Sequence, residues 1–353
     1  MTPASDLFSR LAIPRGTGTE GNRTVRALLV DALQARGFQV EQQEFPAAPD
    51  SLVAVQVAGA ALGGGAFAAL LLSQVAAARA FIPALALALV AGLVIYLQRA
   101  AHQAPRRVAT GVNLIARKGG GLPEFWLVAH YDSKSQPLSM AGRIVAGALG
   151  VVGAAGLLVF SADPTPVAGV LLLPAILGGA LLARCRTGNA SPGALDNATA
   201  LVAVLDILDR APTAKVGVLF PDAEEWGLVG ARAAARERPD LFGGRPIINL
   251  DGLDDRGSAI LFVHRPGPVT ARLQARLRGR VARRLPVFVD GIALAPVSGE
   301  CVTVMRGNWA TARIVHTPRD IPGSLTLSGV REVATAVAAV LGDPGAVARA
   351  GAR

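Results

Sequence analysis

The chain has 353 residues, of which 52% are hydrophobic and only 5% aromatic, and it carries a formal net charge of +10. The apolar excess excludes an ordinary water-soluble enzyme and points to a bilayer. Two cysteines, Cys185 and Cys301, are too few for a disulfide framework, so we expect ordinary buried or membrane-proximal thiols.

The first fifty residues are expected to begin a folded domain. The pattern predicts a helix over Thr24 to Arg36 and a strand over Phe38 to Phe45. The segment Met1 to Arg15 is mixed and short of apolar residues, so we expect no secretory signal there. We therefore assign residues 1–50 to the N-terminal part of a domain that resumes later in the chain.

Four long apolar segments are predicted to cross a membrane as two helical hairpins, at residues 51–98 and 144–183. Each is close to the roughly 20 residues that span about 30 Å of hydrocarbon. Buried core helices are the alternative, but four of them would need a larger core than the remaining chain can cover. The segments are Val57 to Ala78, Ala80 to Leu97, Ile144 to Ala162 and Pro164 to Ala183, with Arg79 and Asp163 between the members of each pair.

The positive residues that flank these segments predict their orientation. Only Arg79 lies in the loops opposite the chain ends, so we expect a multi-pass protein whose polar domain faces the cytoplasm. The residues on the side of the chain ends are Arg99, Arg106, Arg107, Lys134, Arg143, Arg184 and Arg186.

A further basic cluster contains Arg272, Arg276, Arg280 and Arg283 at helical spacing. It predicts a solvated helix face or a contact with anionic lipid. The basic residues form no motif interleaved with aromatic ones, so we expect the lipid bilayer as a partner and no nucleic acid.

The rest of the chain is predicted to form one domain from residues 1–50, 99–143 and 184–341, followed by a frayed tail at 342–353. Val112 to Arg117 and Phe125 to Ala129 are predicted strands around a glycine-rich turn. From Thr187 onward, predicted helices and strands alternate and end with a helix over Thr326 to Val340. This alternation predicts an α/β fold with a mixed, largely parallel sheet flanked by helices, in addition to about four transmembrane helices.

Potential metal ligands follow four apolar runs that we interpret as buried strands. Because ligand sites gather at the carboxyl ends of parallel strands, these residues are expected to share one crevice. Asp196 stands at a predicted helix start before Ala198 to Leu208. Two histidines and several carboxylates suit zinc or a similar divalent ion. The runs are Phe125 to Ala129 before His130, Val216 to Phe220 before Glu224 and Glu225, Ile247 to Leu250 before Asp251, and Ile314 to Val315 before His316.

The ordered motifs around these residues resemble those of the M28 family of zinc peptidases. The resemblance covers nearly all of the chain outside the apolar segments. Its five pieces are Ala129-His130-Tyr131-Asp132-Ser133, Ala194-Leu195-Asp196-Asn197, the run from Ala223 to Gly230, Asn249-Leu250-Asp251 and Val315-His316-Thr317.

The resemblance implies two zinc ions that share one carboxylate. One ion would be held by His130, Asp196 and Asp251, and the other by Asp196, Glu225 and His316. A water between two such cations has a pKa near neutrality and serves as the nucleophile.

Further residues receive roles from the same resemblance. Glu224 would act as general base, and Asp132 would orient the imidazole of His130 without binding metal. Relatives commonly use a tyrosine or histidine in the last third of the domain to stabilise the oxyanion. Here His264 is the candidate for that role, with Asn308 as a weaker one.

We therefore expect a membrane-integral, cytoplasm-facing zinc metallopeptidase, an aminopeptidase that removes N-terminal residues from short peptides. Three alternatives stay open: a glutaminyl cyclase with one metal, a carboxypeptidase, and a catalytically silent membrane scaffold or receptor-like protein. The sequence indicates neither the oligomeric state nor the natural substrate.

Overall fold

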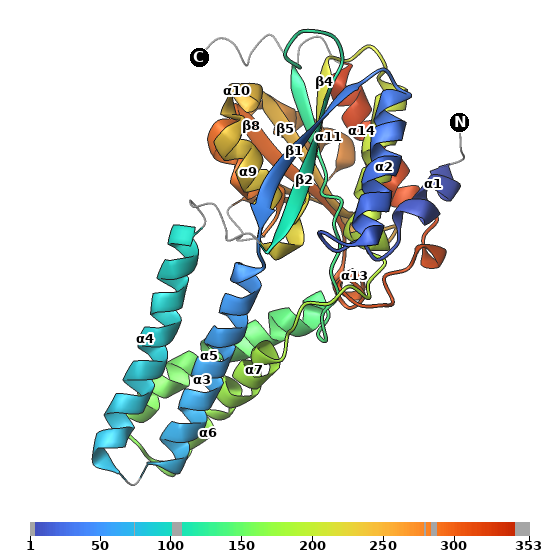
Figure 1. Cartoon of the computed structure of the whole chain (residues 1–353). Helices are drawn as coiled ribbons and strands as arrows, with labels where there is room; N and C mark the ends of the chain where they lie inside the picture. The colour runs from blue at the N-terminus through green and yellow to red at the C-terminus, as the bar shows by residue number, and fades with distance from the viewer. Residues whose placement is uncertain (1–3, 74, 101–107, 279, 284–287, 343–353) are drawn as a thin grey trace. The chain divides into compact units, whose positions relative to one another are not determined.

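The computed structural model describes residues 4–73, 75–100, 108–278, 280–283 and 288–342. The chain folds into two compact units, a sheet unit and a helical unit (Figure 1). The sheet unit comprises Met1–Ala48, Pro105–Ser135 and Gly188–Arg353, and the helical unit comprises Pro49–Ala104 and Gln136–Thr187. The two long apolar parts of the sequence thus form a unit of their own, and three segments that are distant in the sequence together form the sheet unit.

The sheet unit contains an eight-stranded sheet in the order β1-β2-β4-β3-β5-β8-β6-β7. Its four central strands, β4, β3, β5 and β8, run parallel, whereas β2 joins β4 and β6 joins β8 in antiparallel fashion. The predicted mixed sheet flanked by helices is confirmed, with four of the seven strand pairings parallel. The strands are β1 Gln39–Ala47, β2 Ala109–Arg117, β3 Phe125–Val128, β4 Val216–Phe220, β5 Pro246–Leu253, β6 Ser258–Arg265, β7 Arg280–Arg283 and β8 Glu300–Gly307.

Both faces of the sheet are covered, which explains why its central strands are continuously apolar. On β3, Leu127 points into the larger core, and Trp126 and Val128 point into the smaller one on the opposite face. The larger core is shared with α1 Ala4–Leu11, α2 Glu20–Gln34, α8 Thr199–Arg210, α11 Pro268–Leu277 and α14 Ser328–Leu341. The smaller core is shared with α9 Val229–Glu237, α10 Pro239–Phe242 and α12 Asp290–Leu294.

The helical unit consists of α3 Asp50–Leu71, α4 Ala76–Ala100, α5 Met140–Ala162, α6 Pro166–Val170 and α7 Leu173–Ala183. Glycines let its backbones approach closely. A Cβ atom on Gly59 of α3 would lie 2.8 Å from the carbonyl oxygen of Gly179 of α7, and one on Gly153 of α5 would lie 2.2 Å from the nitrogen of Ala175. This small-residue packing is typical of helices that associate in lipid.

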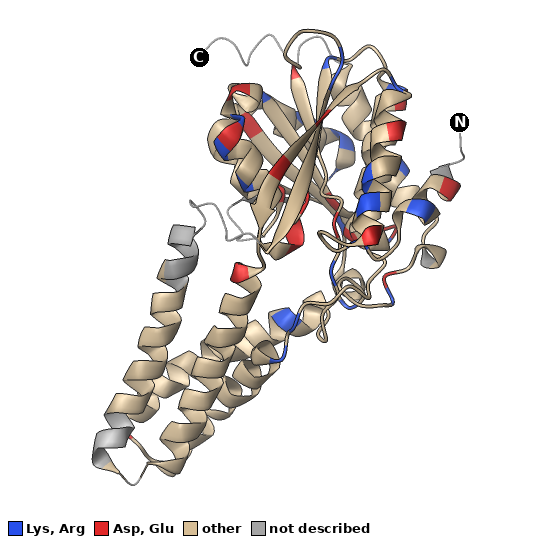
Figure 2. Ribbon diagram, in the orientation of Figure 1, with Lys and Arg blue, Asp and Glu red and all other residues tan. Residues whose placement is uncertain are grey.

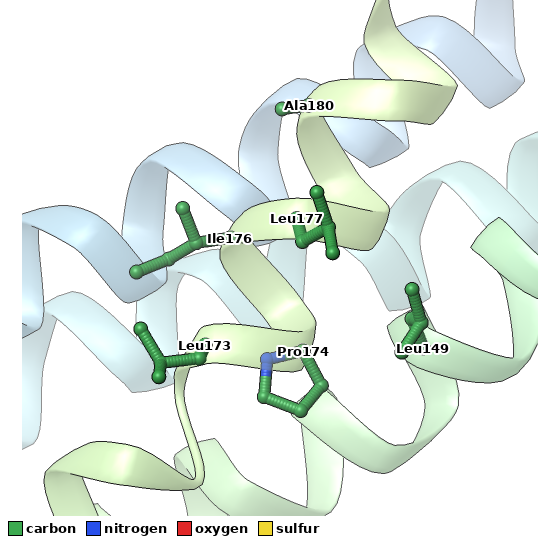
Figure 3. Close-up of a pocket in the computed structure, with 6 residues that line it drawn as sticks. All are labelled: Leu149, Leu173, Pro174, Ile176, Leu177 and Ala180. Carbon is green, nitrogen blue, oxygen red and sulfur yellow. The ribbon is translucent and has the colours of Figure 1, made fainter.

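Most of the exposed side chains along the described helices of the helical unit are apolar. In Figure 2 the described parts of its helices carry almost no charge along their lengths. Phe81, Val151 and Val167 are 65%, 74% and 78% exposed. An open groove of about 500 Å³ on α5 and α7 is lined only by apolar residues, as Figure 3 shows: Leu149, Leu173, Pro174, Ile176, Leu177 and Ala180.

Three stretches of the described chain are long and apolar enough to cross a membrane: Asp50–Leu71, Met140–Ala162 and Pro166–Ala183. A shorter apolar stretch, Phe81–Leu93, lies within α4. These helices suggest membrane association. The four-pass topology and the cytoplasmic orientation stay predictions.

Several predicted boundaries were wrong. The chain turns between Leu71 and Ala76, so Arg79 lies within α4 instead of in the loop. The basic cluster does not share a helix, because α11 ends at Leu277 and Arg278 adopts a left-handed conformation, which places Arg280 and Arg283 on β7. Arg106, Arg107 and the tail after Gly342 lie outside the described residues.

Candidate metal centre

Four of the residues predicted to form the centre lie at the carboxyl ends of three neighbouring parallel strands. His130 comes two residues after β3, and the Glu224-Glu225 pair lies in the 3₁₀ turn Glu224–Trp226 after β4. Asp251 lies within β5, because that strand continues to Leu253, so the expectation that it follows the strand was wrong. The common carboxyl edge of β3, β4 and β5 brings these residues together.

The remaining two ligands come from turns. Asp196 lies in the irregular π-helical turn Ala194–Ala198 before α8. His316 follows α13 Trp309–Ala312 in a tight turn, with φ of 66°, so the strand predicted at Ile314 to Val315 does not exist. The strand of this region is β8, which ends at Gly307.

The structure gathers the six residues into two buried groups. One contains His130, Glu224 and Asp251, and the other contains Asp196, Glu225 and His316. Within each group, the atoms able to bind a metal lie within 4.8 Å of one another. The grouping places Glu224, the predicted base, beside the first pair of ligands.

Asp196 connects the two groups through its two carboxylate oxygens. Oδ1 lies 3.1 Å from Nε2 of His130, and Oδ2 lies 2.9 Å from Nε2 of His316. Nε2 of His130 also lies 3.9 Å from Oδ1 of Asp251, and Nε2 of His316 lies 3.1 Å from Oε1 of Glu225. The carboxylate of Asp196 therefore faces both histidines, an arrangement that suits a ligand shared by two metal ions.

Asp132 contacts both His130 and the glutamate turn. Its Oδ1 lies 3.4 Å from Nδ1 of His130, a long contact. Its two oxygens also accept hydrogen bonds of 3.1 Å from the backbone N–H groups of Glu224 and Glu225. Asp132 thus holds the Glu224-Glu225 turn at least as firmly as it holds the imidazole, which the sequence did not indicate.

Lys134 is a buried cation of the centre, although its sequence position suggested a membrane-flanking residue. Its Nζ lies 2.5 Å from Oε2 of Glu225. This ion pair occupies one oxygen of Glu225 and leaves Oε1 directed at His316. Nothing in the sequence around Lys134 distinguishes a buried partner of Glu225 from a lysine on the surface.

Asp196 is held in place by a second carboxylate, that of Asp320. Oδ1 of Asp320 accepts from the backbone N–H of Leu195 at 2.7 Å, and Oδ2 accepts from that of Asp196 at 3.3 Å. Burial raises the pKa of Asp320 to about 6, against the opposing effect of these hydrogen bonds. The side chain of Asn197 bonds to Leu250 and Gly252, which ties the same turn to β5.

The close charges shift the pKa values of the centre in opposite directions. Burial would raise the pKa of Asp196, but its contacts with His130 and His316 lower it well below its usual value. His316 and Lys134 likewise outweigh burial and lower the pKa of Glu225 to about 2. Burial raises the pKa of Glu224 well above normal, with added repulsion from Glu225 and Asp290.

Asp251 and His130 are shifted upward as well. Burial and the charge of Asp196 raise the pKa of Asp251 well above its usual value. For His130, burial alone would lower the pKa, but Glu224, Asp132 and Asp196 outweigh it and raise the pKa well above normal. Four neighbouring carboxylates thus share one small, buried space.

Asp290, the first residue of α12, is an acidic group that sequence reasoning missed. It is 1% exposed, and neither of its oxygens accepts a hydrogen bond from the described residues. Burial raises its pKa to about 7, and its charge acts on Glu224 and Asp251. An aspartate before a glycine is typical of a turn, so no sequence signal distinguished it.

His264, the predicted oxyanion stabiliser, belongs to neither group of ligands. Its Nε2 lies 2.8 Å from Oγ1 of Thr303, and burial lowers its pKa to about 4. Asn308, the weaker candidate, caps α13 by accepting from the backbone N–H groups of Ala310 and Thr311. The role of His264 stays a prediction.

The donor set fits zinc. Imidazole nitrogens and carboxylate oxygens are ordinary zinc ligands, and a cation is what a buried cluster of Asp196, Glu224, Glu225 and Asp251 requires. The fold and the site define an α/β protein with a buried metal centre at the carboxyl edge of its parallel strands.

Comparison with known families gives the class more narrowly. Residues 113–341 match the model of Peptidase family M28, so the chain belongs to this family. The resemblance inferred from the five sequence motifs is thereby confirmed. No curated protein sequence matches the chain.

Solved structures share the fold at low sequence identity. Glutaminyl cyclase from Porphyromonas gingivalis has a TM-score of 0.55 and 16% identity, over 95% of each chain. The aminopeptidase from Aneurinibacillus sp. strain AM-1 has a TM-score of 0.56 and 13% identity, over 95% of this chain and 91% of its own. BSAP, a zinc aminopeptidase from Bacillus subtilis, has a TM-score of 0.55 and 13% identity, over 95% and 93%.

Proposed function

We propose that this chain is a membrane-integral, zinc-dependent aminopeptidase that holds two zinc ions. The observation that carries the proposal is the position of Asp196, whose two oxygens face histidines of two separate ligand groups. One group alone would suit a single structural or catalytic metal. A carboxylate shared by two groups is the arrangement that a two-metal hydrolase needs.

His130, Asp196 and Asp251 would hold one zinc ion, and Asp196, Glu225 and His316 the other. When bound, the ions supply Lewis-acid activation of the attacked carbonyl and of the nucleophilic water. Lys134 keeps Oε2 of Glu225 occupied, so Oε1 is the oxygen available as a ligand. Asp132 fixes the turn through its bonds to the Glu224 and Glu225 backbone.

Glu224 is proposed as the general base. It is buried and lies with His130 and Asp251, and burial raises the pKa of its carboxyl group. Its carboxylate would take a proton from water and deliver it to the leaving amine.

An N-terminal rather than a C-terminal substrate fits the charges of the centre. A carboxypeptidase requires a buried cation for the substrate carboxylate. Of the described residues, Lys134 is paired with Glu225, and Arg15 donates to four backbone carbonyls, so neither is free for that purpose. Asp290, whose charge acts on Glu224 and Asp251 and whose oxygens accept no hydrogen bond from the described residues, instead favours the ammonium group of a peptide N-terminus.

The membrane part of the proposal is supported by composition and length. Three described stretches satisfy the length and hydropathy of a membrane span, and their exposed residues are apolar. We propose a multi-pass protein with its sheet unit in the cytoplasm, in keeping with the positive residues that flank the apolar segments.

The test is hydrolysis of a panel of aminoacyl chromogenic amides by the full-length, detergent-purified protein. We expect turnover that a chelator abolishes, that zinc restores and that Glu224→Ala removes. Zinc retention without any turnover would refute the aminopeptidase assignment, and cyclisation of an N-terminal glutamine peptide would replace it with glutaminyl cyclase activity.

A further inference from the structure

Arg15 is a fully buried arginine whose side chain donates, among the described residues, to four backbone carbonyls. Nε donates to Tyr131 at 2.7 Å, and Nη2 donates to Gly193 at 2.9 Å. Nη1 donates to Pro192 at 2.5 Å and to Ile13 at 3.2 Å. Four hydrogen bonds thus spread over three chain segments, which only a planar guanidinium with diverging donors achieves.

Three of the four acceptors of Arg15 belong to the two segments that carry His130 and Asp196. Tyr131 directly follows His130, and Gly193 lies three residues before Asp196. The backbone of Arg15 adds to the same connection, because its N–H donates to Oγ of Ser133 at 3.1 Å. Oγ of Ser133 in turn donates to the carbonyl of Ser191 at 3.2 Å. Arg15 and Ser133 therefore connect the segment that carries His130 to the segment that carries Asp196.

We propose that Arg15 is a positioning residue that fixes the spacing between His130 and Asp196 and so sets the affinity of the centre for its metal. Nε2 of His130 and Oδ1 of Asp196 are 3.1 Å apart, and the guanidinium is the group that spans their two segments. Arg15 precedes residue 113, so it lies outside the region that matches the family model. The inference rests on the metal-binding part of the proposed function and not on the aminopeptidase assignment.

The geometry and the charge of Arg15 have opposite effects on metal binding. The charge acts on Asp320, Asp132, Asp196 and Glu225, so a neutral side chain would leave the centre more negative and attract a cation more strongly. Loss of the hydrogen bonds would instead let the two ligand segments separate and weaken binding. Although burial lowers its pKa to about 10, Arg15 stays charged at neutral pH. The sign of the change in affinity therefore separates the two roles.

The experiment is a zinc titration of full-length, detergent-purified protein against a chromogenic chelator, with Arg15→Lys and Arg15→Met variants. Arg15→Lys keeps the charge but cannot reach Tyr131 and Gly193 together from one nitrogen. If Arg15 acts by position, both variants bind zinc more weakly, by about 10- to 100-fold, the usual effect of groups that orient metal ligands. Wild-type affinity in Arg15→Lys with equal or tighter binding in Arg15→Met would overturn the proposal.

Arg36→Met is the matched control, because the Arg36 side chain also makes several hydrogen bonds, two to Asp209 and one to the carbonyl of Ala32, but at a more exposed position away from the ligands. We expect its zinc affinity to equal that of the wild type. Ser133→Ala removes the backbone link while keeping the guanidinium, so it tests the same spacing if Arg15→Met does not fold. Ser133→Ala and Arg15→Lys that both bind zinc as the wild type does would also overturn the proposal.

The outcome is distinguishable from a failure of the proposed function. Wild-type protein that binds zinc but hydrolyses no aminoacyl amide would refute the aminopeptidase assignment and leave the comparison of Arg15 variants intact. Wild-type protein that binds no zinc would overturn both proposals.

Discussion

Replacement of Asp132 by asparagine tests how the centre is held together. Asp132 accepts one hydrogen bond of 3.1 Å on each oxygen, from the backbone N–H groups of Glu224 and Glu225. Asparagine offers one carbonyl oxygen and one NH₂ group, so one of the two backbone N–H groups would face a donor. A hydrogen bond to a charged group contributes about 1.5–3 kcal/mol, and an unsatisfied buried donor has a cost of similar size.

We therefore expect Asp132→Asn to lower the free energy of unfolding at pH 7 by about 1.5–3 kcal/mol. Because the lost bond holds the turn of the proposed base, we also expect kcat/KM to fall by about 10- to 100-fold. Urea unfolding followed by circular dichroism measures the first quantity, and the aminoacyl amide assay measures the second.

The matched control is Asp206→Asn, since Asp206 pairs with Arg210 on the partly exposed face of α8. Exposed pairs of this spacing contribute about 0.3–0.5 kcal/mol, so this variant should keep nearly full stability and activity. An Asp132→Asn protein as stable and as active as the control would show that Asp132 does not hold the glutamate turn.

Three further predictions concern the metal, the helix contacts and a surface carboxylate. Chelation should lower the melting temperature, because zinc at about 1,000 times its Kd stabilises the native state by about 4.1 kcal/mol, and calorimetry with and without chelator checks this; an unchanged melting temperature would contradict a bound metal. Gly179→Ala should destabilise the helical unit in detergent, since its Cβ would lie 2.5 Å from the nitrogen of Gly63, whereas Gly64→Ala, with nothing within 4 Å, should not. Burial would raise the pKa of Asp255, but hydrogen bonds from Gly329, Thr326 and Ser328 at the start of α14 lower it to about 2. Its stabilisation is therefore present above about pH 4 and is lost as the pH falls toward 2, so urea unfolding should show the difference between wild type and Asp255→Asn shrinking over that range.

The structure also explains why so many acidic groups occupy the centre. Asp196, the Glu224-Glu225 pair and Asp251 come from three different parts of the chain, and burial strengthens the mutual repulsion of their carboxylates. Arrangements of this kind persist when a cation binds them, because the attraction to the cation exceeds the repulsion between the carboxylates. The repulsion between the buried carboxylates therefore increases the affinity of the site for a metal cation.

Features that depend on local pattern could be predicted from the amino-acid sequence. Uniformly apolar runs such as Val216–Phe220 identified the buried strands, because a strand covered on both faces needs apolar residues at every position. The same logic separated the long apolar helices from the sheet unit. The ordered motifs from His130 to His316 identified the family, because each motif combines a ligand type with a short structural element.

Which distant groups meet in the site depends on tertiary packing. The turn that carries His316 cannot be told from a short strand by two apolar residues, Ile314 and Val315, because its left-handed backbone depends on packing. Lys134 pairs with Glu225, and Arg15 bonds to Tyr131 and Gly193, in each case across a long separation in sequence. The burial of Asp290 likewise depends on residues that are distant in the sequence. Such contacts leave no periodic signal, since one charged residue has the same local pattern whether it faces solvent or a buried partner.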